Sequence, residues 1–113
     1  MNETPVFVPL ATESFEDFRS RGKRWEVRRA ERQWNRGQLR TGRKTTLSCG
    51  YSGPRLYGKI GRVVFGSLQT IFRLIPFEQI EPCAKNKQEA IKENLELLGP
   101  VKEYVAFEVI LEN

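Results

Sequence analysis

The alternation of apolar and polar residues predicts where strands lie along the chain. Residues 6–10 form a short apolar run that predicts a first strand, and Pro5 and Pro9 restrict it to the edge or the end of a sheet. In residues 23–29, Trp25 and Val27 alternate with charged residues, so both apolar side chains can face a core. Further strands are predicted at 45–49, at 56–72 and at 104–111. Glycines within 56–72, Gly66 in particular, indicate a bulge or bend.

Two segments have the spacing of helices. Phe15 and Phe18 lie three residues apart in a segment that Gly22 ends, and either Ser14, with Asp17 at the capping-box position, or Thr12 caps its start. Residues 86–98 form the clearer helix: Asn86 is a suitable N-cap, and Gly99 and Pro100 stop it.

The resulting order is strand, helix, several strands, helix, strand. Such an order predicts an α+β domain, either a small β-barrel or a strongly curved mixed sheet with two flanking helices. The chain has 113 residues and shows no internal repeat or linker, so we expect one domain over residues 1–113.

Charge is unevenly distributed along the chain. Residues 19–62 contain 14 Lys and Arg but two acids, Glu26 and Glu31, a local balance of +12, whereas the remaining residues balance to −7. The first half is therefore expected to build a positive face, whose natural partner is a polyanion such as RNA or a nucleotide. Ordinary solubilising charge is the alternative explanation.

Several classes of chemistry are excluded by composition. The chain has no histidine, which rules out a His-based triad, and its two cysteines match neither a zinc site nor a disulfide framework. No apolar run reaches the roughly 20 residues of a membrane span, and the N-terminus lacks the regions of a signal peptide. We expect a cytoplasmic protein without a metal, a cofactor or a membrane partner.

The strand at 23–29 and the loop after it contain the candidate site. Arg24, Glu26 and Arg28 share the polar face of the strand, which is either a solvated charge ladder or part of a binding site. The following basic loop contains Trp34, which either stacks on a base or folds back as a lid on the core. The candidate RNA-binding residues are Lys23, Arg24, Glu26, Arg28, Arg29, Arg32, Trp34, Arg36, Arg43, Lys44, Tyr51 and Arg55.

These residues resemble the signature of the ASCH domain family, small PUA-like barrels in which Gly-x-Lys-x-x-Glu-x-Arg joins a helix to a strand. Lys23, Glu26 and Arg28 keep that spacing, whereas Gly22 lies one residue later than the pattern expects. The preceding helix, the late helix and the closing strand at 104–108 also resemble the family, so the likeness runs from about Val6 to the end of the chain.

The resemblance implies a cleft beside the strand that binds RNA or a modified nucleoside. Lys23 and Arg28 would contact phosphate or a base carbonyl, while Glu26 would either accept from an exocyclic amine or hold the cleft in shape. We therefore expect an RNA- or nucleotide-binding domain; a protein-interaction module for an acidic partner is an alternative.

A small metal-independent hydrolase is another alternative. Some ASCH-like proteins are similar to acetylcytidine amidohydrolases, which use a Lys, a Thr three residues later and a distant Glu; others are linked to RNA cleavage. Here Glu26 occupies the place of the Thr, and the distant acid would be Glu78 or Glu81. If the chain is an enzyme, Lys23, Glu26 and Arg28 are the candidate catalytic residues.

Overall fold

The computed structural model describes residues 3–112. The elements in chain order are β1 (Val6–Leu10), α1 (Thr12–Ser20), β2 (Trp25–Arg29), β3 (Lys44–Cys49), β4 (Arg55–Gly66), α2 (Leu68–Leu74), a 3₁₀ turn η1 (Phe77–Gln79), α3 (Lys87–Leu98) and β5 (Tyr104–Leu111). The strands form one five-stranded sheet in the order β1-β3-β4-β5-β2.

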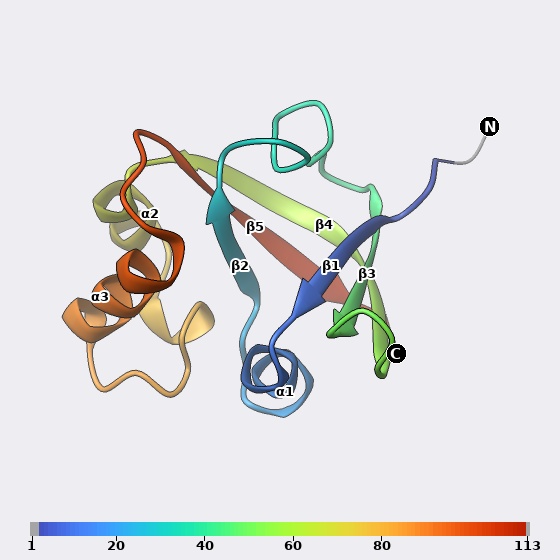
Figure 1. Cartoon of the computed structure of the whole chain (residues 1–113), viewed down its shortest axis with the longest axis horizontal. Coiled ribbons are helices and arrows are strands. Elements are labelled where there is room, and N and C mark those ends of the chain that lie inside the picture. Colours follow the sequence, from blue (N-terminus) through green and yellow to red (C-terminus); the bar gives the residue numbers. More distant parts are fainter. Residues whose placement is uncertain (1–2, 113) are drawn as a thin grey trace.

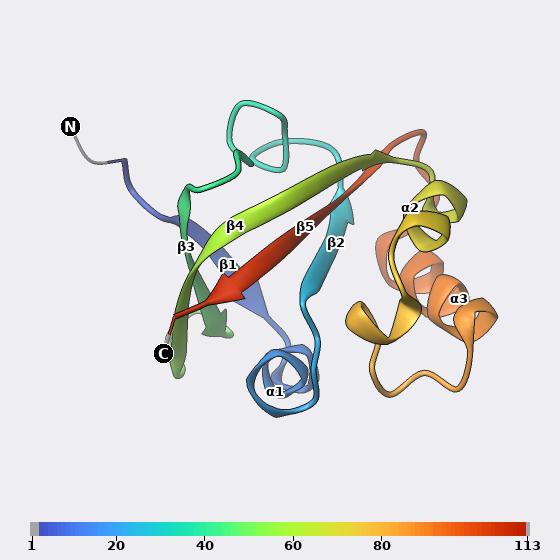
Figure 2. The same ribbon diagram turned by 180° about the vertical axis from the view of Figure 1, so that it is seen from behind.

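The sheet is mixed and strongly curved. β1 pairs in parallel with β3, whereas β3, β4, β5 and β2 pair in antiparallel fashion. Figures 1 and 2 show that the sheet curls. Its two edge strands, β1 and β2, lie on one side of the molecule, and β4 and β5 pass behind them in Figure 1. The expected α+β fold around a curved mixed sheet is confirmed, as a half-barrel.

Two hydrophobic clusters lie on the opposite faces of this sheet. One is enclosed by the curl and includes Val8, Phe15, Trp34, Leu47 and Phe107. The other packs α2 and α3 against the outer face, where Trp25 and Val27 are 2% and 5% exposed. Because β2 alternates between the two faces, its charged residues Glu26 and Arg28 point away from Trp25 and into the curl.

One helix was not predicted from the sequence. Residues 68–74 form α2, so the strand expected over 56–72 ends at Gly66 and is wrong beyond it. Ser67 caps the helix by accepting a hydrogen bond from the Thr70 amide at 3.1 Å. Leu68, Ile71, Phe72 and Ile75 recur at helical spacing and are all buried, and that periodicity is the sequence signal for the helix.

Two local expectations are also corrected. The register of β4 against β5 shifts between Ile60 and Val63, so the irregularity lies at Gly61 rather than Gly66. A Cβ at Gly61 would lie 2.5 Å from a carboxylate oxygen of Glu108, so a larger residue there would displace that side chain. At α1 the N-cap is Ala11 without a side-chain bond, so neither Ser14 nor Thr12 caps the helix.

The other helix ends follow the sequence. Asn86 accepts a hydrogen bond from the Glu89 amide at 2.9 Å, and Gly99 follows α3 with a φ of 77°. Gly22 has a φ of 87° after α1, and this turn leads directly into β2. Within residues 3–112, none of the helices has the length and apolar character needed to cross a membrane.

Candidate functional site

Lys23, Glu26 and Arg28 form a cation–anion–cation row beside and along β2, which we call the charged row. The Lys23 ammonium lies 3.4 Å from Glu26 Oε1, and Arg28 Nε donates to Glu26 Oε2 at 2.7 Å. Lys23 is the most enclosed member, with 3% of its side chain exposed; Glu26 and Arg28 are 10% and 20% exposed. Glu26 thus neutralises two neighbouring cations inside the curl of the sheet.

Lys23 is fully engaged at the closed end of the row. Its Nζ donates to the Ile80 carbonyl at 2.6 Å and lies 5.3 Å from the centre of the Phe18 ring. The segment after α2 is brought here by a backbone bond from Arg24 N to Gln79 O at 2.7 Å. A carbonyl distant in sequence therefore fixes Lys23 against α1 and away from solvent.

Glu81 lies in this same segment, close enough to the charged row for Lys23 to influence its carboxyl. Burial raises the pKa of its carboxyl, although the nearby Lys23 ammonium acts in the opposite direction. Glu81 also accepts a hydrogen bond from Asn94 Nδ2 at 3.2 Å, whereas Glu78 is exposed. Of the two acids considered from the sequence, Glu81 is thus the one beside Lys23.

The raised pKa of Glu81 predicts a pH-dependent effect of Glu81→Gln. A carboxyl whose pKa is raised by folding stabilises the protein when protonated, and this contribution is lost as the pH rises through the folded-state pKa. Glu81→Gln should therefore increase the free energy of unfolding at pH 7 relative to wild type. The difference should disappear below the ordinary glutamate pKa of 4.5, as measured by urea titration at each pH. A variant that loses stability at pH 7 would contradict the assigned direction.

Arg28 closes the seam between the two edge strands. Its Nη2 donates to the Pro9 carbonyl of β1 at 2.8 Å, and its guanidinium lies 4.7 Å from the centre of the Trp34 ring. The carboxylate of Glu26, the Pro9 carbonyl and the indole thus hold the guanidinium in one orientation. The Nη1 donors of Arg28 have no hydrogen-bond partner among residues 3–112.

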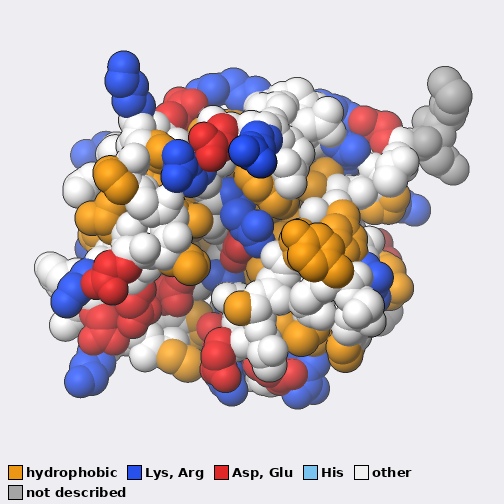
Figure 3. All heavy atoms as spheres, viewed as in Figure 1, with side chains coloured by type: hydrophobic (Ala, Val, Ile, Leu, Met, Phe, Trp, Pro, Cys, Tyr) orange, Lys and Arg blue, Asp and Glu red, His pale blue; other side chains and the backbone are white. Residues whose placement is uncertain are grey.

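A cavity of about 250 Å³ opens beside Arg28, at the C-terminal end of β2. We call it the basic pocket, because Arg28, Arg29 and Arg32 line it together with a single acid, Glu31. Trp34 and Leu98 complete the lining. Figure 3 shows this face hollowed near its centre, with basic and acidic side chains inside the hollow.

The three arginines of the basic pocket differ in their partners. Arg29 is held by the Leu98 carbonyl at 3.2 Å and by Glu31 at 2.9 Å. Arg32 is exposed and forms no ion pair within the part of the chain that the structure describes. Its backbone φ of 56° is the only positive value at a non-glycine residue between 3 and 112. Arg32 is thus an unpaired cation on a turn that favours glycine.

Trp34 folds back as a lid on the core. It is 7% exposed, and its ring stacks on Phe107 with centroids 5.7 Å apart and planes 12° apart. Arg28 covers it as well. Of the two roles considered for Trp34, this geometry matches the lid.

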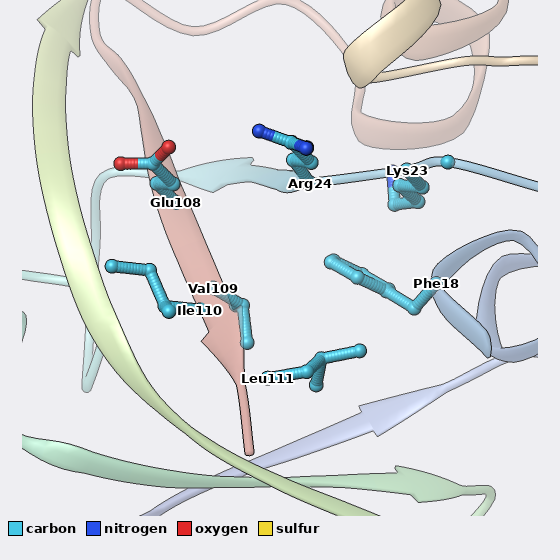
Figure 4. A pocket seen from close by; sticks show the side chains of 8 residues that line it. Phe18, Lys23, Arg24, Glu108, Val109, Ile110 and Leu111 are labelled. Carbon is cyan, nitrogen blue, oxygen red and sulfur yellow. The ribbon is translucent and has the colours of Figure 1, made fainter. Parts of the chain in front are cut away.

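The remaining predicted site residues lie at several places. Arg43 and Tyr51 line a second cavity, next to which Arg55 lies over Phe7. Arg36 pairs with Glu103 at 3.0 Å, and Lys44 is exposed at the start of β3. Lys23 and Arg24 line a third cavity of about 360 Å³ at the N-terminal end of β2, where the Arg24 guanidinium points toward Glu108 (Figure 4). The other walls of that cavity are mainly apolar side chains of α1 and β5.

Folding reduces the charge asymmetry that the sequence shows. Six arginines of the basic segment pair with acids from outside it: Arg19, Arg21, Arg36, Arg40, Arg43 and Arg62. Arg24, Arg32, Lys44, Arg55 and Lys59 remain without an ion pair within residues 3–112. The positive potential of the first half is therefore concentrated on fewer cations than the count implies.

Two parts of the site were not assigned from the sequence. The Pro9 carbonyl orients Arg28, but a backbone acceptor leaves no signal in the residue pattern. Phe7 lies in an apolar run, so the sequence indicated a core residue rather than part of a binding site. The group of acids and thiols needed for a metal site is absent from residues 3–112.

The similarity of this chain to known proteins lies in its structure. No protein-family model matches the sequence, and no curated protein matches it. The crystal structure of hypothetical protein PH0355 superposes with a TM-score of 0.79 at 18% identity, covering 96% of this chain and 100% of that one. Protein PF0455 from Pyrococcus furiosus superposes with a TM-score of 0.70 at 20% identity, covering 96% and 97%.

A third similar structure is that of an ASCH protein. The crystal structure of ASCH from Zymomonas mobilis superposes with a TM-score of 0.65 at 11% identity. The match covers 92% of this chain and 65% of that one. The sequence resemblance and the superposition agree, and the chain has an ASCH-like fold.

Proposed function

We propose that this ASCH-like domain binds RNA or a nucleotide through the basic pocket, with the charged row behind it as support. The observation that carries the proposal is the convergence of Arg28, Arg29 and Arg32 on one cavity with a single carboxylate. Guanidinium groups bind phosphate through paired N–H donors, and the open Nη1 edge of Arg28 is suited to this contact.

Within this proposal the members of the charged row have different roles. Arg28 contacts the ligand, because its guanidinium is both oriented and partly exposed. Glu26 positions Arg28, since each of its carboxylate oxygens already faces a cation. Lys23 holds Glu26 in place from the closed end of the row. The support reduces the entropy lost by Arg28 on binding.

A second candidate function is hydrolysis of a modified nucleoside or of RNA. The specific observation in its favour is Glu81, an acid with a raised pKa beside Lys23, as the amidohydrolase resemblance requires. The carboxylate of Glu26 at the place of the threonine nucleophile weighs against it. Incubation with acetylcytidine and with labelled RNA tests this candidate; intact substrates after prolonged incubation would reject it.

Arg32→Gly tests the basic pocket without damaging the fold. Arg32 has a left-handed φ and no ion pair among the described residues, so glycine should stabilise the protein by about 0.5–1 kcal/mol. Binding of a short single-stranded RNA should weaken about tenfold, the equivalent of one charge-assisted hydrogen bond. The slope of log K against log salt should fall by about 0.7. Fluorescence anisotropy over a salt series measures both.

Lys59→Ala is the matched control. Lys59 is also exposed and without an ion pair within residues 3–112, but it lies on β4 and does not line the basic pocket. Its loss should leave the affinity within about twofold of wild type, because a distant exposed charge is screened by salt. Equal losses in both variants would refute a localised pocket. Binding of an acidic peptide in preference to RNA would favour the protein-interaction alternative.

A further inference from the structure

A surface aromatic pair lies beside the basic pocket. Phe7 of β1 and Tyr51, in the turn after β3, stack with ring centroids 6.1 Å apart and planes 29° apart. Tyr51 is 78% exposed, so most of its ring faces solvent. A ring this exposed contributes little to the core, and its outer face is available for a base to stack on.

The pair has cationic and amide neighbours. The Arg55 guanidinium lies 5.0 Å from the centre of the Phe7 ring, and its Nη2 donates to the Tyr51 carbonyl at 3.2 Å. Phe7 and Tyr51 line a cavity of about 320 Å³ whose wall also includes Arg43 and the side chains of Gln33 and Gln38. Arg43 already donates to the carbonyls of Gln38 and Thr4 and to the Gln38 side-chain oxygen. The groups at this opening that suit a nucleotide are therefore the Tyr51 ring, the neighbouring Arg55 guanidinium and the Gln33 amide.

This aromatic pocket adjoins the basic pocket. Pro9 lines the aromatic pocket, and its carbonyl accepts the hydrogen bond from Arg28, which lines the basic pocket. The two pockets are also adjacent along the chain, because Arg32 lines the basic pocket and the next residue, Gln33, lines the aromatic pocket. In Figure 3 a hydrophobic patch borders the central hollow on the side where Figure 1 shows β1. A single strand that passes over the Arg28–Pro9 seam can therefore reach both pockets.

The geometry points to a second subsite in which an unpaired base stacks on Tyr51 and the phosphate next to that base contacts Arg55. This inference rests on the proposed function and extends it: the ligand is a single strand longer than one nucleotide, with phosphate in the basic pocket and a neighbouring base on Tyr51. A duplex is a poorer ligand, because its bases are already stacked on one another.

The test compares two exposed tyrosines. Tyr51→Ala should weaken binding of a short single-stranded oligouridylate by about fivefold to a hundredfold, the range for one base on an aromatic ring. Tyr51→Phe should bind as wild type does. Tyr57→Ala is the matched control, because Tyr57 is 57% exposed but lies outside the aromatic pocket. Thermal unfolding of each variant checks the fold, and Tyr51→Ala should melt within a few degrees of wild type.

Three outcomes separate this inference from the proposed function. A loss of affinity for the oligouridylate in Tyr51→Ala supports a stacked base if wild type and Tyr51→Ala bind an abasic oligonucleotide with the same, weaker affinity. An unchanged affinity in Tyr51→Ala while Arg32→Gly still binds weakly would overturn the second subsite and leave the basic pocket intact. Failure of the wild type to bind any oligonucleotide or mononucleotide would overturn the proposed function itself.

Discussion

Replacing Glu26 with alanine is expected to lower the free energy of unfolding by about 3–5 kcal/mol. The substitution leaves Lys23 and Arg28 enclosed beside each other without the carboxylate that neutralises both. An uncompensated charge in a poorly solvated site costs far more than an intact pair contributes. Because a domain is typically stable by about 5–15 kcal/mol, this loss removes a large share of its stability.

Urea denaturation followed by tryptophan fluorescence measures the effect of Glu26→Ala. Glu26→Gln is the control, because its amide oxygen can still accept a hydrogen bond from Arg28 and should limit the loss. Arg19→Ala removes an exposed pair with Glu16 and should change the stability by less than about 1 kcal/mol. If Glu26→Ala were no more destabilising than Arg19→Ala, the charged row would not support the fold.

Replacing Trp34 with alanine is expected to cost about 3–5 kcal/mol, as for other buried tryptophans. The indole is 7% exposed, stacks on Phe107 and carries the Arg28 guanidinium on its ring. Its loss opens a cavity in the cluster enclosed by the curl of the sheet and removes one of the contacts that orient Arg28.

Trp34→Phe separates the lid from a base-stacking platform. Phenylalanine retains an aromatic contact with Phe107 and should recover most of the stability, as measured by thermal unfolding. If Trp34→Ala were as stable as wild type and lost only RNA affinity, the ring would be a binding platform rather than a lid. Tyr51, an aromatic residue that is 78% exposed, should show the opposite behaviour, with affinity lost and stability retained.

Local sequence patterns were sufficient to predict much of the fold. The alternation around Trp25 and Val27 is confirmed because β2 has an apolar cluster on each side, so a strict period of two was required there. Helix α3 follows from Asn86 and Gly99, whose effects are local. In contrast, residues 68–72 were assigned to the preceding strand although Leu68, Ile71 and Phe72 have helical spacing and Ser67 is a suitable N-cap.

The candidate site was only partly predictable, for physical reasons. The spacing of Lys23, Glu26 and Arg28 indicated that they lie together, and they do. The exposure of these side chains depends on groups distant in sequence. Lys23 is held inside by its hydrogen bond to the Ile80 carbonyl, and the Pro9 carbonyl orients the Arg28 guanidinium. The neutralisation of Arg36 by Glu103 depends equally on the tertiary fold. Sequence spacing therefore located the site, but the accessibility of each cation required the structure.

The central claim, that RNA or a nucleotide occupies the basic pocket, is tested most directly by the two indole N–H signals in an NMR titration. Trp34 lines the basic pocket, whereas Trp25 lies on the opposite face of β2 and donates its indole N–H to Gln79 at 3.2 Å. We expect a short single-stranded RNA to shift the Trp34 signal in a saturable and salt-sensitive manner and to leave the Trp25 signal unchanged. Saturable binding that shifts Trp25 and leaves Trp34 unchanged would contradict it.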